Sequence, residues 1–262
     1  MIPSPLRSSV GLIAVFCAAQ TFAQLGAFTF PALLPEFLSI WSLSHTQAGW
    51  LSGIFFGAYS AAVPLLVTLT DRIEARRIYI AAVSLTALSH LGMAFLAQGF
   101  ISALGFRILA GIGWAGTYMV GLKALTDHLE GGVLSRGVAA HAASIGVSGS
   151  LSFLLAGLMS AWFDWRAAFV AGAISAAGAL TVAIVFFPRD ARPQQTPPGG
   201  RLLDFKPVFR NRSAMAYAVG YCVHTWEMFV VRSWAVTFLV FTAAQSGERI
   251  NFFIPTVVAM LM

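Results

Sequence analysis

Charged residues are scarce in this 262-residue sequence: they make up 10% of it, whereas 58% of the residues are apolar. A soluble domain carries about 25% charged residues, so this composition excludes an ordinary water-soluble globule. Five long stretches contain no charge at all: 8–35, 37–70, 78–106, 137–163 and 167–188. A helix that crosses a bilayer needs about 20 mostly apolar residues, and each stretch can hold one. The sequence therefore predicts an all-α, polytopic membrane protein, a transmembrane helical bundle embedded in the lipid bilayer.

Cysteine and enzyme motifs are equally scarce. Cys17 and Cys222 are the only cysteines, and both lie in apolar stretches, so neither a disulfide framework nor a cysteine metal site is indicated. The sequence contains no paired-histidine zinc motif, no nucleophile elbow and no phosphate-binding loop. We therefore expect no enzyme activity, no cofactor and no metal ion. The net charge of +6 does not indicate nucleic-acid binding, because the basic residues flank hydrophobic segments, as membrane topology requires.

Seven membrane spans and the start of an eighth are predicted from the apolar stretches. The spans are 11–30, 48–69, 78–97, 101–122, 138–161, 167–187 and 215–241. The eighth begins near Phe252 and has about 11 residues before Met262, too few to cross a ~30 Å core at about 1.5 Å per residue. We therefore expect the sequence to be a fragment of a longer protein.

The connections between these spans alternate in basic charge. The N-terminus and every second connection hold twelve Lys and Arg residues, whereas the other connections hold two, Arg166 and Arg249. Cytoplasmic connections retain Lys and Arg, so we place the N-terminus in the cytoplasm and expect a bacterial-type plasma (inner) membrane. Segment 188–211 is rich in proline and charge, which is typical of a polar linker. The predicted domains are a six-span bundle (1–187), a cytoplasmic linker (188–211) and the start of a second bundle (212–262).

The connection after the second span carries the strongest local motif. It contains Asp71, Arg72, Arg76 and Arg77, with Glu74 between the two pairs. This pattern resembles the loop signature of the major facilitator superfamily of transporters, an Asp-Arg pair and a basic pair spaced by glycines. Val67 and Glu74 occupy the two glycine positions here, so the match is partial.

Three further stretches resemble the same family in order and in span. Gly26 with two following prolines resembles the end of its first span, the run 107–113 its fourth span, and Trp165 with Arg166 the start of its sixth. The resemblance implies two six-span halves, of which this sequence holds the first half, the seventh span and the start of the eighth. It also implies secondary transport by alternating access. The resemblance further implies that these loop residues, Asp71 above all, act as a conformational latch. The alternative is a helix end held by solvated charges.

Polar residues inside the spans are the candidates for the cavity or for ion coupling. They are Gln20, Gln24, Arg107, Tyr118, His224, Glu227 and Arg232. A charge in a membrane span is costly, so Arg107 either lines the transport path or snorkels to the interface. His224 and Glu227 share a helix face, and they either couple protons or contact substrate, or Glu227 pairs with Arg232 or Arg107. The two glutamines and Tyr118 contact a ligand or join helices.

The combined prediction is a secondary active transporter that moves a small-molecule substrate across the membrane, coupled to protons and directed toward export. The competing interpretation is a non-transport integral membrane protein or a non-functional transporter fragment. The two interpretations can be distinguished by whether the encoding DNA specifies further spans after Met262.

Overall fold

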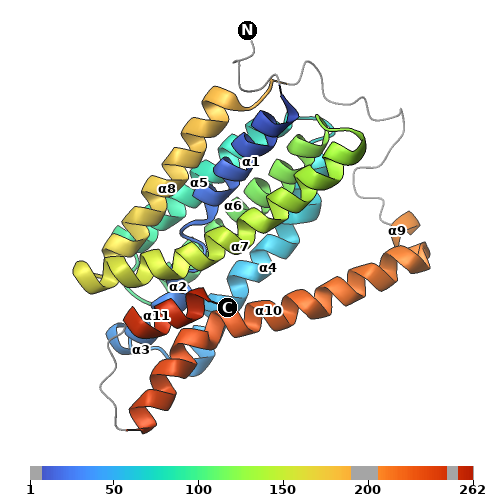
Figure 1. The fold of residues 1–262 in the computed structure, drawn as a ribbon. Coiled ribbons are helices and arrows are strands. Elements are labelled where there is room, and N and C mark those ends of the chain that lie inside the picture. Colours follow the sequence, from blue (N-terminus) through green and yellow to red (C-terminus); the bar gives the residue numbers. More distant parts are fainter. Residues whose placement is uncertain (1–7, 190–205, 247–252, 262) are drawn as a thin grey trace.

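The computed structural model describes residues 8–189, 206–246 and 253–261, and these residues form helices and no strand (Figure 1). The helices are α1 (Ser9–Gln24), α2 (Thr29–Ala32), α3 (Leu34–Ile40), α4 (His45–Leu69), α5 (Ala75–Phe95), α6 (Phe100–Thr126), α7 (Gly131–Trp162), α8 (Trp165–Phe186), α9 (Lys206–Arg210), α10 (Arg212–Gln245) and α11 (Phe253–Met260). The predicted all-α class is confirmed. Arg7, Arg249 and most of the predicted linker lie outside the described residues.

Six of these helices are long and apolar enough to cross a membrane, namely α4 to α8 and α10. Each corresponds to one predicted span. The largest difference is at α7, which begins at Gly131 rather than at residue 138. Hydropathy marks only the apolar part of a helix, whereas the first two turns of α7 carry polar residues such as Ser135 and Arg136. The chain is an integral, multi-pass membrane protein.

The first span is not the single helix that we predicted. Helix α1 ends at Gln24, and the chain turns before α2 and α3. The backbone N–H of Phe28 donates to Ser152 Oγ on α7 at 2.9 Å instead of to a carbonyl one turn earlier. Pro31 has no N–H with which to resume the hydrogen-bond ladder of α1. A side-chain bond from a neighbouring helix and a proline thus replace one turn of helix.

Glycines set the closest helix approaches in the bundle. A Cβ at Gly26 would overlap the imidazole of His90 on α5, and it would stand 3.1 Å from the Cα of Gly172 on α8. On α6, a Cβ at Gly111 would overlap the backbone carbonyl of Phe55 on α4. Small residues at such positions allow helix backbones to meet closely in a bilayer. They hold α6 against α4 and bring α1, α5 and α8 together.

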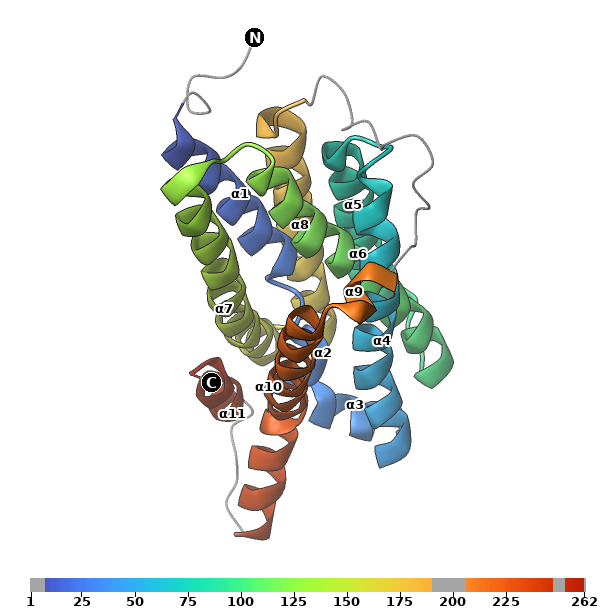
Figure 2. The same cartoon turned by 90° about the vertical axis from the view of Figure 1, so that its right-hand side faces the viewer.

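Apart from Arg107 and Arg166, the described basic residues of α4 to α8 and their connections lie at one end of the bundle. The start of α1, the α4–α5 turn, the α6–α7 turn and the end of α8 lie together in Figure 2. Arg166 belongs to the opposite end, where α8 begins. This arrangement fits the charge alternation expected from the sequence, and the cytoplasmic assignment of the basic end stays a prediction.

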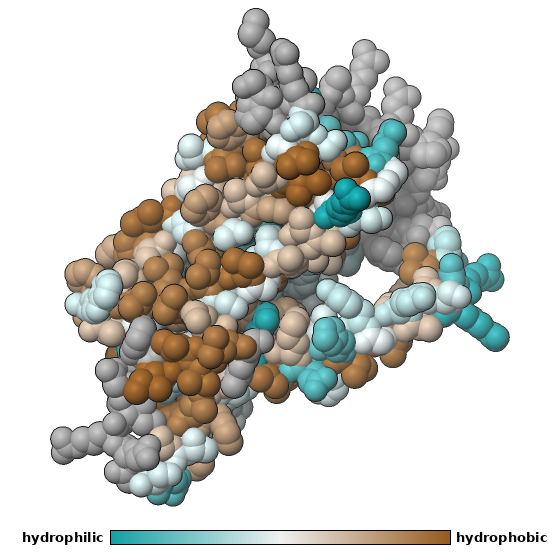
Figure 3. Space-filling model, in the orientation of Figure 1, coloured by the Kyte–Doolittle hydropathy of each residue, from teal (hydrophilic) through white to brown (hydrophobic). Residues whose placement is uncertain are grey.

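Apolar side chains cover the flank between the two ends (Figure 3). Exposed examples are Val147 and Leu151 on α7 and Ile174, Ile184 and Val185 on α8. An exposed apolar band of this extent suits contact with lipid.

Candidate functional site

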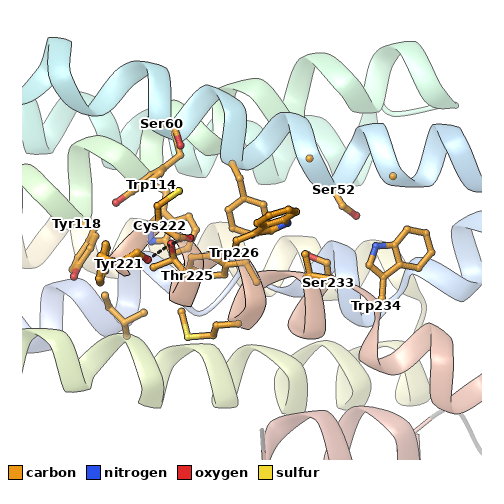
Figure 4. A pocket seen from close by; sticks show the side chains of 18 residues that line it. Ser52, Ser60, Trp114, Tyr118, Tyr221, Cys222, Thr225, Trp226, Ser233 and Trp234 are labelled. Carbon is orange, nitrogen blue, oxygen red and sulfur yellow. Dashed lines mark hydrogen bonds between the residues drawn. The ribbon is translucent and has the colours of Figure 1, made fainter. Parts of the chain in front are cut away.

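A cavity of about 480 Å³ lies between α4, α6 and α10, with one residue, Ile145, from α7 (Figure 4). On α4 its lining residues recur every three or four positions, from Gly49 through Ser52 and Phe56 to Tyr59. This spacing places them on one face of the helix. On α10 the lining includes the row Tyr221, Thr225 and Phe229, together with both chain neighbours of Phe229, so it extends beyond one face of that helix. Figure 4 shows Tyr118 and Tyr221 at one end of the cavity and Trp234 at the other.

The cavity lining is aromatic and uncharged. Its aromatic residues are Phe56, Tyr59, Trp114, Tyr118, Tyr221, Trp226, Phe229 and Trp234, and its small polar residues are Ser52, Ser60, Cys222, Thr225 and Ser233. None of the described residues that line it is acidic or basic. Apolar walls with a few hydroxyl groups are typical of sites for small organic molecules, where the hydroxyls fix the orientation of the ligand.

Trp114 of α6 is the central residue of the cavity wall. Its ring centroid lies 5.0 Å from that of Phe55 and 5.2 Å from that of Tyr59, both on α4, and 5.7 Å from that of Phe229 on α10. Phe56 and Phe229 also approach to 4.6 Å, so α4 and α10 meet through their aromatic side chains. Rings held by several ring contacts present a preformed surface to a ligand.

Arg107 lies in a second, much smaller cavity of about 20 Å³, which shares Trp114 with the first. The Arg107 side chain is buried, with 4% of its residue surface exposed. Its Nε donates to the Leu51 carbonyl at 3.0 Å, and its guanidinium carbon lies 4.3 Å from the ring centroid of Phe55 and 4.9 Å from that of Phe30. Arg107 therefore points into the bundle, and the snorkelling alternative does not describe its position.

The two candidate glutamines of α1 are also buried. Gln20 is fully buried, and its two amide heteroatoms have no hydrogen-bond partner among the described residues. Gln24 lines the small cavity with Arg107. Tyr118 lines the large cavity and stacks on His141 of α7, with ring centroids 5.6 Å apart.

The three candidates of the seventh span lie elsewhere. His224 and Glu227 are exposed, beside a hollow of about 270 Å³ that Arg232 also lines. Neither His224 nor Glu227 lines the aromatic cavity. Arg232 instead extends over the ring of Phe28 at 5.6 Å. Within the described chain, the ion pair of Glu227 with Arg232 or Arg107 that the sequence left open does not form.

The loop motif at the basic end is held partly by α8. Arg76 donates from Nη2 to the Ile184 carbonyl at 2.6 Å and from Nε to the Ala183 carbonyl at 3.3 Å. These carbonyls belong to the last turn of α8, where carbonyl groups lack a donor within the helix. A cation that donates to them is therefore stabilising. Arg77 pairs with Glu74 at 3.2 Å. Asp71 and Arg72 make no ion pair with any described residue, so the structure brings the four motif residues to one end without joining them.

A polar contact joins Glu36 of α3, which lies outside the spans, to the last turns of α7 at the opposite end. The Ser160 hydroxyl donates to Glu36 Oε1. Burial raises the pKa of the Glu36 carboxyl above its usual value, the hydrogen bond from Ser160 opposes this, and the negative charge of Asp164 adds to it.

Sequence reasoning missed most of the cavity. The aromatic residues of α4 and α10 escaped notice because aromatic side chains in a membrane span are ordinarily packing residues. The available signal was their spacing, since Ser52, Phe56 and Tyr59 on α4 and Tyr221, Thr225 and Phe229 on α10 recur at three or four positions.

Comparisons with known proteins place this bundle in a family. Residues 16–262 match the family model of the Major Facilitator Superfamily. A curated relative, the MFS-type transporter YwoD of Bacillus subtilis (strain 168), is 25% identical over 150 residues, which are 57% of this chain and 33% of YwoD. The chain therefore spans about a third of that relative.

Solved structures share the fold. A bacterial homologue of the human lysosomal transporter Spinster, in an inward-facing and unoccupied conformation, superposes with a TM-score of 0.74 and 18% identity over 95% of this chain and 58% of its own. A D-xylose–proton symporter superposes with a TM-score of 0.59 and 18% identity over 97% of this chain and 64% of its own.

The fold and the cavity define a polytopic helical membrane protein in which α1 and α4 to α8 pack against one another. This chain belongs to the Major Facilitator Superfamily. The resemblance noted from the loop motif and from the first, fourth and sixth spans is confirmed.

Proposed function

We propose that this protein is a secondary active transporter that moves a small organic molecule across the membrane by alternating access, with its substrate bound in the aromatic cavity. The observation that carries the proposal is the cavity of about 480 Å³ between the six-span bundle and α10. In a transporter built from two halves, the substrate site lies between the halves near the bilayer midplane. Family membership and the transporter fold of its structural relatives support the same activity.

The lining chemistry defines the class of substrate. The walls carry aromatic rings and hydroxyl groups and no charge among the described residues. A strongly charged solute would lose its hydration there without gaining a counter-ion, which is costly. We therefore propose a substrate with apolar or aromatic surface and a few hydrogen-bonding groups.

We further propose that protons drive this transport, in the direction of export. Glu227 is the only carboxylate within the predicted spans, and a carboxyl group that loses water during the transport cycle binds a proton more readily. That one relative of the same fold is a D-xylose–proton symporter supports proton coupling. Export rests on the mixed aromatic and polar chemistry of the candidate cavity residues.

A transport screen tests this function directly. The full-length protein is reconstituted in vesicles with an imposed pH gradient, and small aromatic and apolar solutes are offered. We expect gradient-dependent movement of at least one such solute, with a roughly tenfold or greater rise in KM for the Phe56→Ala variant, because about 1.4 kcal/mol of lost contact gives a factor of ten. Trp50→Ala is the matched control: Trp50 is on the same helix, 60% exposed and outside the cavity lining. Equal effects of the two substitutions, or no transport of any solute, would contradict the proposal.

A further inference from the structure

Arg107 is a buried cation that has no counter-ion among the described residues. Only 4% of its surface is exposed, and no carboxylate of the described residues lies within ion-pair distance of it. Its one hydrogen bond to a described residue is from Nε to the Leu51 carbonyl, which leaves both terminal Nη groups without an acceptor. The rings of Phe30 and Phe55 offset part of the charge through cation–π contact. A charge buried in this way normally keeps an ionic partner, because the cost of burying it alone is large.

Other polar groups around the same cavity lack partners too. Gln24 Nε2, His90 Nδ1 and Trp114 Nε1 are buried and make no hydrogen bond to any described residue. All three side chains line the small cavity with Arg107. Trp114 Nε1 is a donor only, and the amide nitrogen of glutamine donates as well. Unsatisfied buried donors are rare in native proteins, and several in one place indicate a bound species.

The charge balance of this cavity indicates the sign of that species. Thr86 is the remaining polar residue of its lining, and its hydroxyl already donates to the Ala82 carbonyl at 3.2 Å. The described lining therefore offers one fixed positive charge, several free donors and no carboxylate. An anion satisfies these groups at once, whereas a cation satisfies none of them.

We infer that the cavity beside Arg107 is a binding site for a small anion, held by the Arg107 guanidinium together with Gln24, His90 and Trp114. The cavity volume of about 20 Å³ admits one monoatomic ion or one small functional group. Two sources of this chemistry fit: a free halide, or a carboxylate of a larger molecule that reaches past Trp114 from the aromatic cavity. Anion binding at this site does not require transport activity, so its test is independent of the test of the proposed function.

Thermal unfolding of the purified full-length protein in detergent tests the site without a transport measurement. Sodium chloride, bromide or formate replaces sodium methanesulfonate at constant ionic strength; methanesulfonate carries no carboxylate, and its tetrahedral sulfonate is bulkier than a halide or a carboxylate. We expect a saturable rise in the midpoint, by about 3–5 °C at a tenfold excess over Kd. A rise with chloride and bromide identifies a free halide, and a rise with formate alone identifies a carboxylate. No difference from methanesulfonate overturns the inference and leaves water as the occupant.

Variants locate the effect. Arg107→Met should abolish the anion-dependent shift, and an unchanged shift would overturn the inference. The control is Arg166→Gln, because Arg166 also lies over an aromatic ring, that of Trp165, but is exposed at the other end of the bundle. It should keep the full shift. Should Arg107→Met not fold, Gln24→Met decides: this isosteric change removes one unpartnered donor, so the anion concentration at half-saturation should rise severalfold. An unchanged half-saturation in that variant would also overturn the site.

Discussion

The hydroxyl oxygen of Ser152 on α7 accepts a hydrogen bond from the backbone N–H of Phe28, 124 residues earlier in the chain, at 2.9 Å. Both residues are buried, and the bond spans the bundle at the point where α1 gives way to α2. Ser152 follows Ser144 and Ser148 at a spacing of four on α7, which by itself suits close helix packing. Its position shows a more specific task, which is to satisfy the backbone of an interrupted helix.

Ser152→Ala should therefore destabilise the protein by about 1–3 kcal/mol, because a buried backbone N–H is left without a partner. Ser148→Ala is the control: Ser148 is equally buried, but its hydroxyl donates only to the Ile145 carbonyl of its own helix. Thermal unfolding in detergent measures both. A loss for Ser148→Ala as large as for Ser152→Ala would argue against the bond to Phe28.

Gly111→Ala should destabilise the contact of α6 with α4. Its new Cβ would overlap the backbone carbonyl of Phe55, and backbone atoms cannot rotate away as a side chain can. Overpacking of this kind costs about 1–3 kcal/mol. Gly105→Ala on the same helix meets nothing within 4 Å, so alanine there should be neutral or slightly stabilising. Equal unfolding temperatures of the two variants would contradict the prediction that the close approach of α6 to α4 at Gly111 is required for stability.

Glu36→Gln should change the pH dependence of stability. The pKa of Glu36 is raised in the folded protein, mainly by burial, so the folded state holds its proton to a higher pH than the unfolded state does. The protein therefore loses stability as the pH rises from the ordinary glutamate pKa to the raised value. Glutamine does not titrate, so the variant should gain stability relative to the parent at neutral pH and match it more closely in acid. Unfolding midpoints across pH 4–8 test this, and parallel curves would contradict it.

Glu227→Gln should abolish gradient-driven transport and leave expression and folding intact. Glutamine keeps the size of the side chain and removes its proton binding. Glu227 is exposed among the described residues, so the loss of its charge has little structural cost. Vesicle uptake with and without a pH gradient separates coupling from binding. Normal gradient-driven transport by this variant would exclude Glu227 from proton coupling.

Asp71→Asn should slow the conformational cycle and leave substrate affinity unchanged. The carboxylate makes no ion pair with any described residue, so it is available to a partner outside this set. We expect a lower maximal rate with an unchanged KM. Asp127→Asn is the control, because Asp127 also lies in a basic-end turn but pairs locally with Lys123 at 2.8 Å. Equal turnover of the Asp71 variant and the parent would count against a latch.

The sequence predicted the membrane class, the spans and the family because each depends on composition and local order. Charge-free stretches of 20 or more residues have one physical solution in a bilayer, so six spans agree with helices of the structure. The interruption at Phe28 was not predictable, since it depends on a hydroxyl 124 residues away. For the same reason the sequence identified Arg107 of α6 as important but not its neighbour His90, which comes from α5.

Site prediction was weakest on α10. The spacing of His224 and Glu227 predicted that they share one face of α10. In the structure both line the hollow that Arg232 also lines. The face that lines the aromatic cavity carries Tyr221, Thr225 and Phe229 instead. Which face of an apolar helix meets the bundle depends on packing, and a sequence with aromatic residues all around the helix does not define it.

The bond of Arg76 to the last turn of α8 has a mechanical consequence. It fastens α5 to α8 at the basic end, while the glycine contacts of α1, α5 and α8 fasten the same helices farther along. In the first half of α10, by contrast, most residues are exposed. The buried residues of this helix, Ser233, Ala235 and Val236, lie in its second half. We therefore expect α10 to move relative to the six-span bundle about these buried residues, and this movement to change access to the aromatic cavity.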